Sequence, residues 1–112
     1  MSRLNNKKLL QLADKCRNDG NNSAKYRRFG CALEYYNKSL CYIDQEKESL
    51  ALTYAERSAI CFECDEFESC LRNIQLALDH KYPSNEIAIL NERRSECLRI
   101  LESKLNHIIG SF

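Results

Sequence analysis

Residues 26–40 read YRRFGCALEYYNKSL, and residues 64–78 read CDEFESCLRNIQLAL. When the first stretch is laid over the second, side chains of similar size coincide at a constant offset of 38 residues. The matched pairs are Phe29 and Phe67, Ala32 and Cys70, Leu33 and Leu71, Tyr36 and Ile74, Ser39 and Ala77, and Leu40 and Leu78. Amphipathicity alone would not require sizes to recur in register. Internal similarity at this spacing is typical of a helical solenoid.

The rest of the chain favours helix as well. Its 112 residues contain only one Pro and three Gly, and Val is absent. With so few helix breakers, we expect an all-α chain that forms a single domain over residues 1–112. The pattern predicts a first helix pair within about 4–43, a second within about 49–80, and a terminal fifth helix. The five predicted helices are 4–25, 29–43, 49–63, 66–80 and 84–105.

Three local features bear on these boundaries. Residues 44–47 are predicted to form a loop that lengthens the spacing beyond the usual 34 residues of a helix-pair repeat. Tyr82 and Pro83 are predicted to stop the fourth helix, with Ser84 as the N-cap of the fifth. Read locally, the sequence around Gly20 indicates a turn. The repeat instead places Gly20, Ser58 and Ser95 at matching positions, where a paired helix packs too closely for a larger side chain.

The repeated units resemble a known family. Residues 50–62, LALTYAERSAICF, resemble the tetratricopeptide repeat (TPR) phrase built around Tyr-x-Asn-Arg-Ser-Ala. The run from Tyr54 to Pro83 resembles the N-terminal TPR region of the type-4 SET and MYND domain methyltransferases, and residues 93–98 continue the likeness. The resemblance covers about residues 13–103. It implies a TPR helical-hairpin solenoid with two repeats plus a terminal fifth helix.

The resemblance also implies a function: a non-catalytic scaffold or adaptor that binds a peptide or protein segment in a concave groove. The alternative is a regulatory TPR segment, or a truncated relative, of a SET/MYND protein-lysine methyltransferase. The enzyme parts of that family are missing from this sequence. His80 and His107 do not stand in the setting of a SET active site, and the zinc-ligand spacings of a MYND finger are absent. We therefore expect no catalytic residue and no cofactor.

The cysteines are the candidate metal or redox ligands. Cys61 and Cys64 have the Cys-x-x-Cys spacing, but no second pair completes a four-ligand zinc site. We expect both sulfurs on the inward face of a helix as packing atoms, with a metal or redox role as the alternative. A further set, expected at small apolar positions of the helices, comprises Cys16, Cys31, Cys70 and Cys97.

Composition excludes several other classes. Seventeen Lys and Arg against sixteen Asp and Glu give a net charge of +1, which argues against a nucleic-acid binder. No stretch approaches the roughly 18 apolar residues that would span a membrane. Seven cysteines, an odd number, without an export signal predict reduced thiols in the cytoplasm or the nucleus.

The groove residues follow from the resemblance. Many TPR domains hold the acidic C-terminal peptide of chaperones with a two-carboxylate clamp, and the matching positions here are Arg17, Asn21, Glu56, Ile89 and Arg93. Glu56 adds a negative charge and Ile89 removes a cation, so we do not expect strong binding of that peptide. Glu56 is predicted to pair with Arg17 or Arg93 and to leave a groove suited to a basic or polar peptide. The alternative is that these charges only neutralise one another on a solvated surface.

The predicted last helix carries an apolar face with no partner helix after it. We expect that face to bind a downstream segment, a partner helix or a second copy of the chain, which would be self-association through the last helix. Fraying of the tail is the alternative. The apolar residues concerned are Ile87, Leu90, Leu98, Leu101, Leu105, Ile108 and Ile109.

Overall fold

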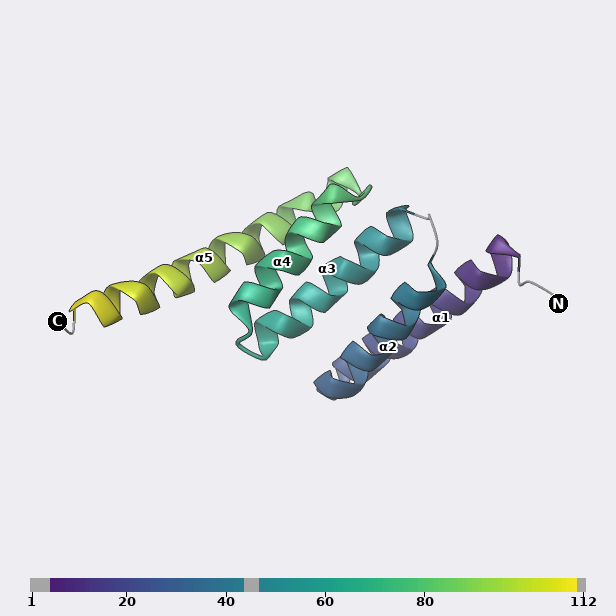
Figure 1. Cartoon of the computed structure of the whole chain (residues 1–112), viewed down its shortest axis with the longest axis horizontal. Coiled ribbons are helices and arrows are strands. Elements are labelled where there is room, and N and C mark those ends of the chain that lie inside the picture. The colour runs from purple at the N-terminus through teal and green to yellow at the C-terminus, as the bar shows by residue number, and fades with distance from the viewer. Residues whose placement is uncertain (1–4, 44–46, 111–112) are drawn as a thin grey trace.

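The computed structural model describes residues 5–43 and 47–110, and this part of the chain is all-α (Figure 1). Five α-helices and one short 3-10 turn, η1, follow one another along it. They are α1 (Asn6–Lys25), α2 (Phe29–Tyr42), α3 (Lys47–Glu63), α4 (Phe67–Asp79), η1 (Ser84–Glu86) and α5 (Ile87–Gly110). The prediction of five helices is confirmed.

The helices pair as two hairpins. α1 packs along α2 and α3 packs along α4, while α5 lies against α4 and reaches past it (Figure 1). α1 also contacts α3, and α3 contacts α5, so these three helices follow one another on one side of the chain. The extents are 64 × 28 × 25 Å, and the radius of gyration is 16.0 Å. A compact domain of this length would have a radius of gyration of about 13 Å, so the chain is elongated.

The turns inside the two hairpins have the same geometry. Arg27 and Asp65, which are 38 residues apart, are the non-glycine residues with positive φ in the described ranges, at 59° and 60°. The next N–H in each turn, from Arg28 or Glu66, donates to a carbonyl of the preceding helix at 2.9 and 2.8 Å. This is the Schellman arrangement, which ends a helix with one left-handed residue. The 38-residue repeat is therefore present in the backbone as well as in the side chains.

Gly20 lies inside α1 at a close helix crossing. A Cβ atom there would come within 2.5 Å of Tyr36 Cε1 and 3.2 Å of the Ala32 carbonyl oxygen, so only glycine fits without displacement. Ser58, the matching residue of α3, is fully buried. The helical interpretation of Gly20 is confirmed. The same prediction is wrong for Ser95, which is exposed because no described helix packs on that face of α5.

The core runs through the helix interfaces in two clusters. The first joins α3, α4 and α5, and its fully buried members include Cys70, Leu90 and Cys97. The second cluster crosses from the first hairpin to the second, where Tyr36 and Ala32 of α2 meet Ile60 of α3. Burying large apolar side chains at these contacts is the main force that holds the hairpins together.

Several predicted helix ends are corrected by the structure. Asn5 caps α1, accepting a hydrogen bond from the Lys8 N–H at 2.8 Å. Lys47 belongs to α3 rather than to the predicted loop, whose other residues, 44–46, lie outside the described ranges. Ser84 is not the N-cap of α5, because it opens η1, which has no side-chain cap. α5 continues to Gly110 instead of stopping near residue 105.

Within the described residues, no helix combines the length and the apolar character that crossing a membrane would need.

Candidate functional site

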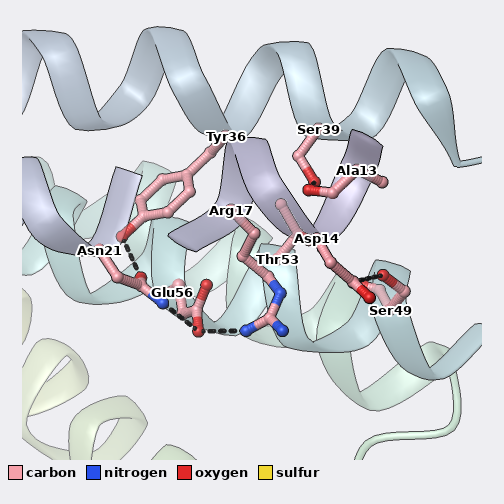
Figure 2. Close-up of polar contacts among 9 residues, drawn as sticks. All are labelled: Ala13, Asp14, Arg17, Asn21, Tyr36, Ser39, Ser49, Thr53 and Glu56. Carbon is pink, nitrogen blue, oxygen red and sulfur yellow. Dashed lines mark hydrogen bonds and ion pairs between the residues drawn. The ribbon is translucent and has the colours of Figure 1, made fainter. Parts of the chain in front are cut away.

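Of the five positions that match the TPR clamp, three come together between α1 and α3: Arg17, Asn21 and Glu56. The Glu56 Oε1 atom accepts hydrogen bonds from Arg17 Nη1 at 2.9 Å and from Asn21 Nδ2 at 3.0 Å. Figure 2 shows Arg17 and Asn21, from α1, converging on Glu56 of α3. Arg17 and Asn21 are one helical turn apart, so both side chains project from the same face of α1.

Tyr36 of α2 extends this network into the first hairpin. Its hydroxyl donates to Asn21 Oδ1 at 2.6 Å, which orients the Asn21 amide so that its Nδ2 points to Glu56. The ring is buried, and burial raises the pKa of Tyr36, so the hydroxyl stays protonated as a donor. The network therefore connects α1, α2 and α3 through charged and neutral hydrogen bonds (Figure 2).

The Glu56 carboxylate forms its hydrogen bonds within its own chain and is largely buried. Its side chain is 26% exposed and that of Arg17 is 18% exposed. The Oε2 atom of Glu56 is buried and has no hydrogen-bond partner among the described residues. Burial raises the pKa of Glu56, and the hydrogen bonds from Asn21 and the charge of Arg17 partly oppose that rise. Glu56 thus uses Oε1 for two hydrogen bonds within its own chain while Oε2 is buried, and the preference of the groove for a basic or polar peptide stays a prediction.

Arg93 of α5 acts at a different point of α3. Its Nη1 atom donates to Ser58 Oγ at 2.9 Å and to the Ala55 carbonyl oxygen at 3.4 Å. The prediction that Glu56 pairs with Arg17 or Arg93 is confirmed for Arg17, whereas Arg93 bonds Ser58 and Ala55 instead. Ile89 projects from α5 with 56% of its surface exposed.

Together these contacts link α1, α3 and α5, the first helix of each hairpin and the terminal helix, which we call the inner helices; α2 and α4 are the outer helices. Glu56 ties α3 to α1 through Arg17, and Arg93 ties α5 to α3 through Ser58. Hydrogen bonds to charged groups typically stabilise by about 1.5–3 kcal/mol when they are partly buried. The roles of Tyr36 and Ser58 as polar partners were missed at the level of sequence. A buried tyrosine hydroxyl needs a hydrogen-bond partner, and that requirement was the available signal.

The Cys-x-x-Cys pair is divided by the end of α3. Cys61 is buried, as predicted, and burial raises the pKa of its thiol. Cys64 is exposed in the turn after α3, so its predicted inward position is wrong. Of the other cysteines, Cys70 and Cys97 are buried, Cys16 is half-buried, and Cys31 is exposed instead of filling a packing position.

The two histidines lie at helix ends. His80 follows α4, where its Nδ1 atom is 2.6 Å from the Leu76 carbonyl oxygen and its ring packs 5.8 Å from that of Tyr54. His107 is in the last turn of α5. Over residues 5–43 and 47–110, no three His, Cys, Asp or Glu side chains gather as a metal site would require.

Comparison with known proteins gives one consistent likeness. No family model matches the sequence, and no solved structure matches it. Protein-lysine N-methyltransferase SMYD4 of Danio rerio is 34% identical over 91 residues, which are 81% of this chain and 12% of that protein. The proteins of the same name from Pongo abelii and Homo sapiens are 33% and 30% identical over 82 residues, 73% of this chain and 10% of each relative. The chain thus spans about a tenth of the length of these curated relatives, and it is similar to one region of SMYD4 methyltransferases.

Proposed function

We propose that this chain is a TPR-type helical solenoid whose function is to bind a peptide or protein segment in the groove formed by α1, α3 and α5. The observation that carries the proposal is the repeated hairpin, which has the same left-handed turn residue 38 positions apart. Stacked hairpins of this kind place their first helices side by side, and this surface is the usual binding face of such proteins. The contacts of α3 with α1 and with α5 are those expected of that arrangement.

The charges of the groove limit which ligand fits. Glu56 occupies the place where a clamp for a C-terminal carboxylate would need a neutral amide, and Ile89 brings no cation. We therefore propose that the acidic tail of chaperones is not the ligand. A role for Glu56 as a receptor for basic peptides is not proposed, because its Oε1 atom already accepts from Arg17 and Asn21 and its Oε2 atom is buried.

A second candidate function rests on the comparisons. Identity of 30–34% to a region of SMYD4 supports a regulatory TPR segment of a protein-lysine methyltransferase whose catalytic domains lie outside this chain. Sequencing of the transcript tests this alternative. A reading frame that continues into SET and MYND sequence would support it, and a stop codon after residue 112 would contradict it.

Selection from a displayed library of natural protein segments, followed by titration of the selected peptides, tests the proposed binding function. The chain should bind selected segments at a one-to-one ratio. Arg93→Ala should weaken the binding of these segments about tenfold, a loss of about 1.4 kcal/mol in binding free energy, because Arg93 faces the groove. The matched control is Arg94→Ala, which removes the same charge from the exposed neighbouring position. Failure to select any segment, or equal losses for the two variants, would contradict a groove function.

A further inference from the structure

A cavity of about 440 Å³ lies between the two hairpins, at the ends where their turns are. Its walls come from the last turn of α1, the loop between α1 and α2, and Phe29 at the start of α2. The last two turns of α3 and Arg93 of α5 complete them. Because it is lined by α1, α3 and α5, it forms the turn end of the proposed groove. Its volume is within the range of about 300–1,000 Å³ that is common for ligand sites.

The floor of this pocket is apolar and well supported. Ile60 is 4% exposed and belongs to the cluster that joins the two hairpins. Phe62 is half-buried and packs edge-on against Phe67, with ring centroids 5.6 Å apart. Phe29, which packs against the same cluster as Ile60, also lines the pocket. Such a surface suits one large aliphatic or aromatic side chain of a ligand, which would gain burial without requiring the pocket to reorganise.

The rim of the pocket is mainly cationic. Lys25, Arg27 and Arg93 line it together with a single carboxylate, Glu63. The Arg27 guanidinium lies 5.1 Å from the centre of the Phe29 ring and 3.9 Å from the Glu63 carboxylate. That ion pair is long, and its side chains are 73% and 52% exposed, so solvent weakens it and it leaves Arg27 available to a ligand. Within residues 5–43 and 47–110, Lys25 has no ion-pair partner.

We propose that this pocket takes an acidic protein segment in which a large apolar side chain is flanked by aspartate or glutamate. The inference rests on the proposed groove function and adds the chemistry of the partner. The apolar side chain packs against Phe62, Ile60 and Phe29, and the flanking carboxylates meet the cations of the rim. Lys25 and Arg27 are exposed and separate, not converged on one buried point. They therefore suit side-chain carboxylates within a segment rather than a terminal carboxylate that needs a desolvated clamp.

The test uses the whole chain and a fluorescent peptide, acetylated and amidated, with the central sequence Glu-Asp-Phe-Asp-Glu between Gly-Ser spacers. Fluorescence anisotropy should show saturable binding. Replacing the central Phe by Ala, or the four acids by Lys, should weaken binding at least tenfold. A version of the peptide with a free C-terminal carboxylate in place of the amide should bind with an affinity that differs less than twofold. Binding that requires the free carboxylate, or that survives the change to Lys, would overturn the proposal.

Two variants of the chain should shift affinity in opposite directions. Lys25→Glu should weaken the acidic peptide about tenfold, whereas Glu63→Gln should tighten it several-fold because it removes the one carboxylate of the rim. Lys7→Glu is the matched control. It makes the same charge change on the same helix about 27 Å away, beyond the Debye length of about 8 Å at physiological salt, and it should leave affinity unchanged.

The outcomes separate this inference from the proposed function. If segments selected from the library bind in the groove but lack acidic residues, the acidic preference is wrong and the groove function stands. If Lys25→Glu and Lys7→Glu weaken the acidic peptide equally, the attraction is a general charge effect and the pocket is not the site. Circular dichroism of each variant checks that the helices remain folded.

Discussion

Replacing Gly20 by alanine should destabilise the chain, although alanine is the better helix former. The added Cβ would lie 2.5 and 2.7 Å from two ring carbons of Tyr36, closer than folded proteins allow. The ring cannot easily move, because it is buried and its hydroxyl is held by Asn21 at 2.6 Å. Overpacking of this kind costs about 1–3 kcal/mol, and a weakened Tyr36 hydrogen bond costs about 1 kcal/mol more.

Helix propensity acts in the opposite direction. Alanine in place of a glycine inside a helix contributes about 0.5–1 kcal/mol, so the expected net loss for Gly20→Ala is about 2 kcal/mol. For a chain of this size that loss lowers the melting temperature by about 8 °C. Gly30 of α2 is the matched control, since a Cβ there would meet no atom within 4 Å.

Thermal and urea unfolding followed by far-UV circular dichroism measure both variants. Gly30→Ala should be as stable as the parent chain or gain up to about 0.5 kcal/mol. A Gly20→Ala chain that is as stable as Gly30→Ala would refute the close crossing of α1 and α2. It would restore the interpretation of this stretch as an open turn.

Four further predictions concern the turns, the polar network and the thiols. Asp65→Gly should raise the free energy of unfolding by about 0.5–1 kcal/mol, because glycine adopts the left-handed conformation without strain; a loss of stability in urea would contradict the turn geometry. A double-mutant cycle of Arg17→Met and Glu56→Gln should show a coupling of about 1–2 kcal/mol, and simple additivity would exclude the ion pair. Burial raises the pKa of Glu56 above its usual 4.5, so the folded chain binds that proton more readily. As the pH falls from 7 through the raised pKa, the free energy of unfolding of the parent should therefore increase relative to that of Glu56→Gln. The increase should be complete below pH 4.5. Identical dependence of stability on pH in the two proteins would contradict this. In labelling with a thiol reagent, exposed cysteines should react at once and buried ones only on unfolding, and burial that raises the pKa of Cys70 to about 12 slows its reaction further. The expected fast group is Cys31, Cys41 and Cys64, and the slow group is Cys61, Cys70 and Cys97.

Much of the fold followed from spacing alone. The 38-residue offset pairs Phe29 with Phe67, and the structure begins α2 and α4 at these residues, one residue after the predicted start of the fourth helix. Periodicity works here because buried faces recur with the helical repeat. The left-handed turn residues were not foreseen, since Arg27 and Asp65 are not the glycine or asparagine that usually marks such a position.

The candidate site was less accessible from the sequence. The resemblance to the TPR clamp pointed to Arg17, Asn21 and Glu56, but only the crossing of α1 and α3 decides which cation Glu56 meets. Cys64 was misplaced because the helical period was extended past the last residue of α3. The repeat position of Ser95 predicts a covering helix, but no described helix packs there and the residue is exposed. In both cases the pattern was local, whereas burial depends on which elements pack nearby.

The hydrogen bonds that link α1, α3 and α5 bear on how the proposed groove would bind a ligand. Arg17, Glu56 and Arg93 link α1, α3 and α5 by side-chain hydrogen bonds, so the surface of the proposed groove is held by contacts within the chain. A fixed surface loses little conformational entropy on binding. The same contacts engage Glu56 within the chain, and Lys25 and Arg27 supply the exposed charges at the turn end of the proposed groove.

The most direct test of the binding account is a ¹⁵N–¹H correlation spectrum of the labelled chain, titrated with a segment selected from the displayed library. The account predicts saturable shifts concentrated on α1, α3 and the start of α5, extending to Lys25 and Glu63 at the turn end. Shifts confined to the outer helices α2 and α4, or no shifts with any selected segment, would contradict it.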